Sequence, residues 1–283
     1  MIKTKVLSKE SSSKFIERMR LSKSKGESKY KELYSYLESL EEHHGNALLT
    51  LVLPVFNEED TIKELFEDLP NHPLIEIIAV NDGSSDKSLE ELEKVKRFKN
   101  IKIVNHRRNI GYGATIITGV KTAKGKVIVT MDADGQHSAD DIYNLIKPIF
   151  EGEADFTIGS RYLGTYYYDL PITTRLGEIV LEKLIQILFG IKIMNNQNGF
   201  RAFNKKILDI FEKVKYPGYA FCTEQICKAR MRGYKIKECP IKLYDREYGE
   251  SKIVLWNLAI QLFCCVFIYF GKKIFRKMFR RTK

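Results

Sequence analysis

Five short apolar runs alternate with stretches of helical character between residues 47 and 159. The runs are rich in β-branched residues and predict strands at 47–56, 75–80, 101–105, 127–131 and 155–159. The stretches between them predict helices that end near residues 69, 99, 123 and 150. Such alternation builds a mainly parallel sheet with helices on both faces. We therefore predict an α/β domain in which the carboxyl ends of the strands form the ligand-binding edge.

Two carboxylates follow the fourth of these runs. Val127 to Met131 is succeeded by Asp132-Ala133-Asp134, with Gln136 and His137 close behind. Carboxylate and amide oxygens are the ligands that hard divalent cations prefer, and such a cation can hold a diphosphate. We predict that Asp132, Asp134 and Gln136 hold the metal, with His137 either a further ligand or a structural residue. A solvated acidic turn that caps the next helix is the alternative for this stretch.

Polar residues also follow the first two predicted strands. Asn57-Glu58 ends one of them and Asn81-Asp82-Gly83-Ser84 ends the other. Each group alone is typical of an ordinary turn. Together they place hydrogen-bond acceptors beside the predicted metal site, where the base and ribose of a nucleoside would lie. Asp82 is the candidate for the base or ribose.

The second half of the chain is less regular. Leu170 to Ile191 predicts an amphipathic helix that either faces the core or lies in a membrane interface. Further predicted elements are a strand at 198–203, a helix at 205–214, a helix at 221–232 that carries Glu224, and a strand at 234–243. A polar loop, residues 244–252, leads to the final segment.

Both ends of the chain differ from this middle part. Residues 1–46 are polar and basic and predict one or two helices with a break near Gly26, as a solvated extension or docked on a membrane or the catalytic domain. The eighteen residues from Ile253 to Phe270 carry no charge, which permits a short membrane span or a helix lying in the interface. We therefore divide the chain into a helical extension (1–46), a catalytic domain (47–252) and a membrane-contacting helix with a basic tail (253–283).

Charge and cysteine content exclude several classes of protein. The formal net charge is +11, but the last thirteen residues hold seven lysines or arginines and no acid, so the excess is local. A local basic tail favours contact with an anionic membrane surface, and we do not expect nucleic-acid binding. Five cysteines without a CxxC pair indicate neither a disulfide framework nor a zinc site, which fits a reducing compartment. No signal peptide is expected at the amino terminus.

Seven short motifs occur in an order that resembles family 2 glycosyltransferases of the GT-A fold. They are LPVFNEE, VNDGSSD, NIGYGAT, MDADGQH, IGSRY, NGFRAF and DREYGESK, and they span Leu51 to Lys252. The GQH after the acidic pair and the YGESK before the last helix are most similar to dolichyl- and polyprenyl-phosphate sugar transferases. The resemblance implies a GT-A nucleotide-sugar-binding fold, with the helical extension and the membrane-associated helix added at its ends.

The resemblance also implies roles for individual residues. Those that would border the nucleotide or donor diphosphate are Pro54, Phe56, Glu58, Val80, Asp82, Asp132 and Ala133, and those that would hold Mg²⁺ or Mn²⁺ are Asp132, Asp134 and Gln136. Those that would act in catalysis are Asp134, Arg161 facing the acceptor phosphate, and Arg246 and Lys252 closing over the diphosphates. The family usually has tyrosine at the position of Phe56 and aspartate at that of Asn195. At these two positions the chain therefore lacks one polar contact and one charge of the family's pattern, and the charge bears on the sugar specificity.

The implied reaction is transfer of a hexose, with inversion, from a nucleotide sugar to a polyprenyl phosphate, with UDP favoured over GDP. An ionised lipid phosphate needs no strong general base, so the catalytic demand is electrostatic. The implied enzyme is membrane-associated, with its catalytic domain on the cytoplasmic face, and an oligomer is possible.

Three other functions stay open at this point. A family 2 enzyme acting on a saccharide or another hydroxyl acceptor would need a base, for which Glu224 is the candidate. A dinucleotide-dependent oxidoreductase would use Gly111-x-Gly113, but Ile116 stands where the third glycine is required. A non-catalytic membrane-binding protein is disfavoured by the intact acidic pair and basic loop.

Overall fold

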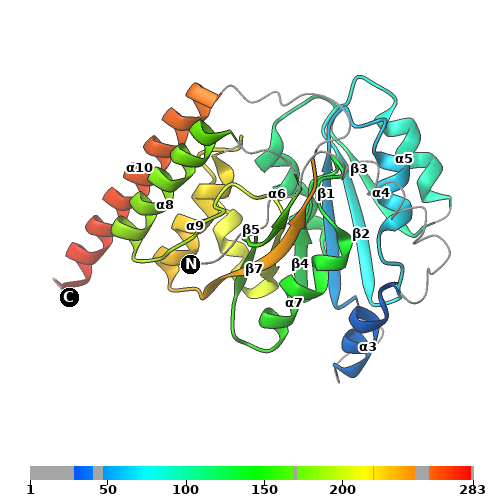
Figure 1. Cartoon of the computed structure of the whole chain (residues 1–283), viewed down its shortest axis with the longest axis horizontal. Helices are drawn as coiled ribbons and strands as arrows, with labels where there is room; N and C mark the ends of the chain where they lie inside the picture. Colours follow the sequence, from blue (N-terminus) through cyan, green and yellow to red (C-terminus); the bar gives the residue numbers. More distant parts are fainter. Residues whose placement is uncertain are drawn as a thin grey trace.

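The sheet of the protein is mixed and has seven strands (Figure 1). A computed structural model describes residues 29–40, 47–97, 99–167, 171–218, 220–245 and 255–281. The strands are β1 (Leu49–Val55), β2 (Ile75–Asn81), β3 (Ile101–Asn105), β4 (Val127–Thr130), β5 (Phe156–Tyr166), β6 (Arg201–Asn204) and β7 (Ile236–Leu243). Their order across the sheet is β3-β2-β1-β4-β6-β5-β7. The predicted mainly parallel α/β architecture is confirmed.

One strand runs against all the others. β1 is parallel to β2 and β4, β2 to β3, and β5 to β7, whereas β6 is antiparallel to both of its neighbours, β4 and β5. The carboxyl ends of β1, β2, β4 and β5 therefore share one edge of the sheet with the amino end of β6. This edge, here called the ligand edge, receives loops from both halves of the chain.

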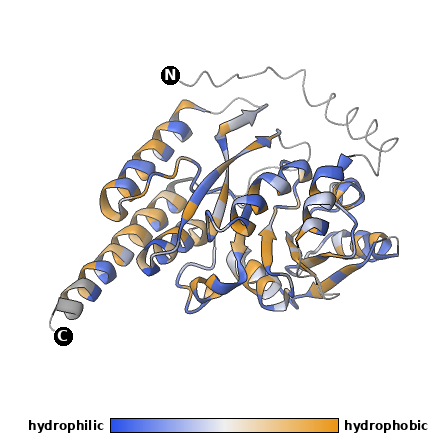
Figure 2. Ribbon diagram, turned by 90° about the horizontal axis from the view of Figure 1, so that it is seen from below, coloured by the Kyte–Doolittle hydropathy of each residue, from blue (hydrophilic) through white to orange (hydrophobic). Residues whose placement is uncertain are grey.

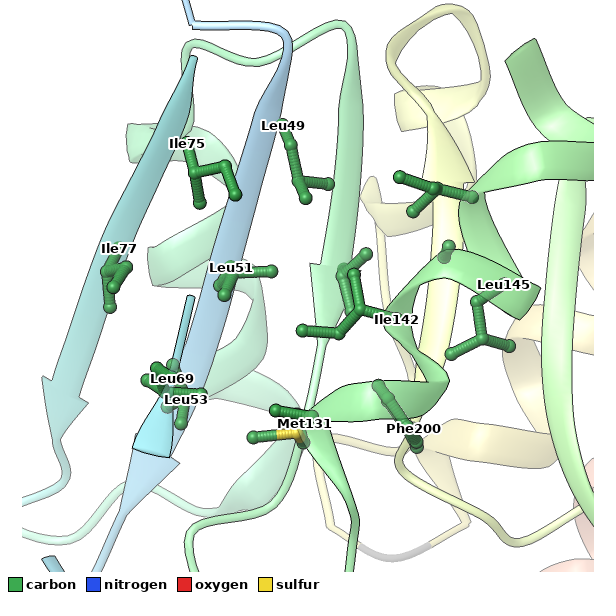
Figure 3. Packing of buried hydrophobic residues seen from close by; sticks show 14 of the residues in the cluster. Leu49, Leu51, Leu53, Leu69, Ile75, Ile77, Met131, Ile142, Leu145 and Phe200 are labelled. Atoms are coloured by element: carbon green, nitrogen blue, oxygen red, sulfur yellow. The ribbon is translucent and has the colours of Figure 1, made fainter. Parts of the chain in front are cut away.

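Helices cover both faces of the sheet, because alternate residues of each strand point to opposite sides. The helices are α3 (Lys31–Ser39), α4 (Ile62–Asp68), α5 (Ser88–Lys96), α6 (Tyr112–Thr122), α7 (Ile142–Phe150), α8 (Ile172–Phe189), α9 (Phe221–Arg232) and α10 (Leu255–Arg281), with 3₁₀ turns η2 (Ala139–Asp141) and η3 (Lys205–Phe211). Leu49, Leu51 and Leu53 of β1 lie in one core with Ile142 and Leu145 of α7 (Figure 3). Buried residues of α3, α4 and α5 belong to the same core. Val52 faces the other side, where α6, α8, α9 and α10 enclose a second core.

Some elements differ from their predicted bounds. β5 continues to Tyr166 instead of ending at 159, because pairing with β7 resumes at Thr165 after an irregularity that begins at Ser160. β6 begins only at Arg201, since residues 198–200 form a turn in which the Asn198 side chain accepts the amide of residue 200. The helix predicted at 205–214 is the shorter 3₁₀ turn η3.

The amino-terminal extension is docked on the catalytic domain wherever the structure describes it. Leu33 and Leu37 of α3 are buried in the same core as β1. Lys29 forms an ion pair of 2.6 Å with Asp68, and Tyr36 packs edge-on against Tyr143 of α7. The expectation of a solvated extension was wrong for residues 29–40. Residues 1–28, with the expected break at 26, and 41–46 lie outside the described residues.

Helix α10 packs along α8 and α9 at one side of the molecule (Figure 1). Leu262, Cys265, Val266 and Tyr269 are buried and lie on one face, at helical spacing. Among the described helices, α10 alone is long and apolar enough to cross a membrane, over Asn257–Arg276 with a mean hydropathy of 1.7, and 22% of that window is buried in the protein. The predicted apolar helix is therefore present, and it continues into the basic tail.

Candidate active site

The loops after β1 and β2 are joined into one rigid wall of the ligand edge. The amide of Asn57 donates to the Ser84 hydroxyl at 3.0 Å, and the Ser85 amide donates back to the Asn57 side chain at 2.8 Å. The amide of Glu58 donates to the Ser88 hydroxyl at 2.8 Å. Asn57 has φ of 56°, in the left-handed region that asparagine tolerates better than most residues. The turn after β1 and the turn after β2, which lie almost 30 residues apart in the sequence, are thus held together by hydrogen bonds.

Asp82 stands at the end of β2 and is almost fully buried. Its carboxylate lies 2.7 Å from Nδ1 of His106 and accepts the amides of Ile110 at 3.0 Å and Gly111 at 2.9 Å. The sequence predicted a base or ribose contact for Asp82 but gave no sign of these partners. Asp82 fixes the loop that leads into α6, and its contact with a nucleotide stays a prediction.

The acidic pair follows β4 at the centre of the ligand edge. Asp134 is buried, and its Oδ1 accepts the amide of Gln136 at 3.2 Å. The side chain of Asp132 is 30% exposed, and its Oδ2 lies 3.6 Å from Nε2 of His137. The other oxygen of Asp132, Oδ1, is buried and has no hydrogen-bond partner. The structure therefore brings the predicted acidic residues together.

These residues fit a divalent cation that also binds a substrate. A buried carboxylate oxygen without a partner is costly, and a cation or water would satisfy it. In the described parts of the chain, no group of three or more histidine, cysteine, aspartate or glutamate side chains could hold a metal by itself. Mg²⁺ and Mn²⁺ are often bound by one or two carboxylates together with substrate phosphates and water, which two aspartates can provide.

Burial alone would raise the pKa of Asp132, but its neighbours reverse the effect. The imidazole of His137, the hydroxyl of Tyr112 and the charge of Arg201 together hold the pKa of this carboxyl below its usual value. His137 is itself buried and packs 5.1 Å from the ring of Phe200. The buried Nδ1 of His137 has no hydrogen-bond partner, so both roles open for this residue, metal ligand and structural residue, stay predictions.

Gln136 connects the acidic pair to the loop that carries the predicted cations. Its Nε2 donates to the carbonyl of Tyr244 at 3.1 Å, and the Tyr244 amide donates to the carbonyl of Gln136 at 2.9 Å. Tyr244, which directly follows β7, is therefore held beside Gln136. Arg246 and Lys252, predicted to close over the diphosphates, lie outside the described residues.

Arg201 was not predicted, although it lies in the NGFRAF motif. It is 1% exposed and donates four hydrogen bonds of 2.6 to 2.9 Å to Asn196, Asn198, Cys222 and Gln225. These bonds hold the loop before β6 against the start of α9. The position where the family usually has aspartate, Asn195, is also buried, and it donates to the Gly159 carbonyl at 3.3 Å.

Arg161 of β5 forms an ion pair with Glu178 of α8. The same carboxylate accepts the hydroxyl of Tyr162, and Arg175 stacks over the Tyr162 ring at 3.8 Å. The contacts of Arg161 and Tyr162 with Glu178 and Arg175 were not predicted. The three-residue spacing of Arg175 and Glu178, which puts both on one face of a helix, was the sequence signal that could have indicated a charged cluster there. That Arg161 faces an acceptor phosphate stays a prediction.

The other predicted nucleotide neighbours lie at the same edge with different exposure. Pro54 and Phe56 are partly exposed, whereas the side chains of Val80 and Ala133 are buried. Ala133 uses its carbonyl to accept the Thr61 hydroxyl at 2.7 Å. Any contact of Val80 or Ala133 with a ligand would therefore involve the main chain.

Glu224 is part of the protein interior and not of the ligand edge. Its side chain is 0% exposed and pairs with Lys228 at 2.7 Å. It also accepts the amides of Lys215 and Tyr216 and the hydroxyl of Tyr269 on α10. Both oxygens of this carboxylate already accept hydrogen bonds from the protein, and the side chain has no exposed surface through which it could contact a substrate. The expectation of Glu224 as a general base was wrong.

The sheet order, the acidic pair at its ligand edge and the antiparallel β6 are the features of a GT-A-type glycosyltransferase fold. The fold is similar to that of glucosyl-3-phosphoglycerate synthase from Mycobacterium tuberculosis, solved with Mn²⁺, UDP and phosphoglyceric acid, with a TM-score of 0.62. The two chains are 18% identical, over 80% of this chain and 79% of that one. Residues 50–211 match the model of glycosyl transferase family 2. The chain belongs to this family.

Two relatives carry informative names. The UDP-N-acetylglucosamine–dolichyl-phosphate N-acetylglucosaminyltransferase of Methanococcus voltae is 33% identical over 226 residues, which cover 74% of this chain and 90% of the relative. The dolichol-phosphate mannosyltransferase of Pyrococcus furiosus is 30% identical over 217 residues, which cover 72% of this chain and 59% of the relative.

Proposed function

We propose that this glycosyltransferase moves a hexose, with inversion, from a nucleotide sugar to a polyprenyl phosphate at a membrane surface. The observation that carries the proposal is the acidic pair at the end of β4, with a buried oxygen of Asp132 that has no hydrogen-bond partner. The names of the two relatives support the lipid phosphate as acceptor. A UDP-sugar is the proposed donor, supported by the relative from Methanococcus voltae.

Each part of the edge then has a task. The double turn of residues 57–59 and 84–88 would form the wall against the nucleoside. Asp132, Asp134 and Gln136 would hold Mg²⁺ or Mn²⁺, which when bound supplies positive charge against the leaving diphosphate. Arg246 and Lys252, from the segment that follows Tyr244, would add further charge. An acceptor phosphate is already ionised, so the absence of Glu224 from the edge removes nothing the reaction needs.

Two adjacent helices would place this edge at a membrane. Ile172, Leu176, Val180 and Ile187 of α8 are exposed, the first and last by 78% and 77%. Ile260, Phe263 and Phe267 of α10 are exposed as well. Figure 2 shows orange, apolar residues along both helices. Since α8 also carries Arg175 and Glu178 beside Arg161, a helix lying on the membrane would bring a lipid phosphate to that arginine.

We further propose that this membrane is met from its cytoplasmic face, where nucleotide sugars are made. The division into residues 1–46, 47–252 and 253–283 is kept as a proposal, with the change that α3 belongs structurally to the catalytic domain. α10 likewise packs on that domain, through Tyr269 and Glu224.

A donor and acceptor screen tests the proposed function. Purified protein with Mn²⁺ is incubated with UDP-GlcNAc, UDP-glucose or GDP-mannose and a short polyprenyl phosphate, and the released nucleotide and the glycolipid are measured. The matched acceptor control is the same polyprenol without its phosphate. We expect product with the phosphate only, and none with the Asp134→Ala variant. Turnover on a saccharide or alcohol, without turnover on the lipid phosphate, would select the hydroxyl-acceptor alternative.

A further inference from the structure

The Gly111-Tyr112-Gly113 segment has a use other than dinucleotide binding. Gly111 has φ of 97°, a region that glycine adopts without steric cost. A Cβ atom on Gly113 would lie 2.7 Å from the carbonyl oxygen of Pro217 and 2.7 Å from the ring of Phe221. Both glycines are therefore required by the path of the chain. The residue between the two glycines, Tyr112, is the first residue of α6 and is placed by them at the ligand edge.

The start of α6 is clamped from two sides. On one side, the carboxylate of Asp82 accepts the amides of Ile110 and Gly111. On the other, the amide of Gly113 donates to the carbonyl of Pro217 at 2.6 Å. Tyr112 therefore leaves a backbone whose position is fixed by the end of β2 and by the segment before α9.

The hydroxyl of Tyr112 meets the carboxylate of Asp132 in a space left open by Gly199. A Cβ atom on Gly199 would lie 2.5 Å from the Tyr112 hydroxyl and 2.4 and 2.5 Å from the two oxygens of Asp132. All three groups thus border one small volume. The hydroxyl of Tyr112 donates a hydrogen bond to the carboxylate of Asp132.

We propose that Tyr112 is a positioning residue that orients Asp132 for the metal–diphosphate complex. A hydrogen bond from a rigidly held hydroxyl limits rotation of the carboxylate and fixes the direction of the oxygen that has no partner. Groups that orient metal-binding carboxylates in this way typically change metal affinity or activity by 10- to 100-fold when they are removed. The inference rests on the proposed function, because it assumes that Asp132 contributes to a metal site.

Tyr112→Phe tests the inference, and the chain offers a matched control. Tyr234→Phe also removes a tyrosine hydroxyl that donates to an aspartate, Asp209, at 3.0 Å. Tyr234 lies just before the amino end of β7, at the edge of the sheet opposite the acidic pair. The affinity of each variant for Mn²⁺ is measured by electron paramagnetic resonance in the presence of UDP, and UDP binding is measured again in EDTA. We expect Mn²⁺ affinity to fall about 10-fold in Tyr112→Phe and to be unchanged in Tyr234→Phe. UDP binding without metal and the melting temperature should match wild type in both.

The outcomes separate this inference from the proposed function. If the wild-type protein with UDP does not bind Mn²⁺, the metal site itself is refuted. If the wild type binds Mn²⁺ and Tyr112→Phe binds it equally well or more tightly, the metal site stands and the positioning role of Tyr112 is overturned. Gly199→Ala is a second variant, because its methyl group would displace both Tyr112 and Asp132. It should lose more Mn²⁺ affinity than Tyr112→Phe, and equal affinity in wild type and Gly199→Ala would also overturn the inference.

Discussion

Replacing Glu224 by glutamine tests whether this carboxylate attaches α10 or takes part in catalysis. The substitution keeps the shape of the side chain but removes its charge. It also places an NH₂ group where an oxygen now accepts a hydrogen bond from an amide, from Tyr269 or from Lys228. The ammonium of Lys228, whose side chain is 5% exposed, would be left without its counter-ion.

The expected cost follows from this burial. Removing one partner of a buried ion pair destabilises a protein by about 3–5 kcal/mol. A loss of 1 kcal/mol lowers the melting temperature by about 2–4 °C in proteins of roughly 150–250 residues, slightly smaller than this one. The variant should therefore melt roughly 6–20 °C below wild type. Turnover, measured well below both melting points, should be unchanged.

The stabilisation by Glu224 also has a defined pH dependence. Burial alone would raise its pKa, but the bonds from Lys228, Tyr269 and the two amides outweigh burial and hold the pKa below its ordinary value of 4.5. A group whose pKa is lower in the folded protein stabilises it fully above the unfolded pKa. As the pH falls below about 4.5 and then through the folded pKa, this contribution is lost. The difference in stability between wild type and Glu224→Gln should therefore narrow in acid.

The assay is thermal unfolding in detergent, followed by circular dichroism at neutral and acidic pH, with turnover measured on the same samples. Glu153→Gln is the control, because it removes an equal charge from an exposed pair with Lys237 and should leave the melting temperature unchanged. A Glu224→Gln variant that melts within about 3 °C of wild type would refute the structural role. Loss of turnover without loss of stability would restore Glu224 as a catalytic candidate.

Four further outcomes are expected. Asp134→Ala, or excess EDTA added to wild type, should abolish transfer, and full activity in EDTA would exclude the metal. Arg246→Ala should lower kcat by about 10²-fold with a smaller change in donor affinity, whereas an unchanged kcat in detergent with a short acceptor would remove it from the catalytic residues. Ile187→Glu combined with Phe267→Glu should weaken binding to anionic liposomes without changing the melting temperature, because both side chains are exposed; unchanged liposome binding would contradict the membrane-facing role of α8 and α10. Leu37→Ala should destabilise the protein by about 2–5 kcal/mol in urea unfolding, and a negligible effect would show that α3 is not part of the core.

The sequence predicted the elements of the fold better than their directions. Apolar runs and the acidic strand end located β1, β2 and β4, because burial on both faces leaves a strong compositional signal. The direction of β6 leaves no such signal, since a strand of four residues reads the same in either orientation. The helical spacing of Leu33 and Leu37 indicated α3, but a single helix does not reveal which surface will bury its apolar side.

The candidate site, like the fold, was predictable from the sequence only in part. Asp132 and Asp134 were predictable because their chemistry and their position after a strand both point to a metal. The partners of Asp82 lie 24 to 29 residues away along the chain, and two of the four partners of Arg201 lie 21 and 24 residues away. Tyr112 meets Asp132 across the ligand edge. Such partners are set by tertiary structure, and no local pattern contains them.

Because β6 runs antiparallel to its neighbours, an insertion before this strand and an insertion after it would have different effects. The chain enters β6 across the ligand edge, where Gly199 lies against Asp132, and an added residue in 196–200 would shift that contact. It leaves β6 at the opposite edge, where the amides of Asn204 and Lys205 donate to the carbonyls of Asp155 and Lys126. An insertion before residue 201 would therefore alter the site itself, whereas one at the opposite edge would not. At that edge an insertion is admissible at the exposed turn of residues 151–153, but not within η3, because Ile207 and Ile210 are buried in the second core. A fusion partner or reporter peptide belongs on that far edge, out of reach of both substrates.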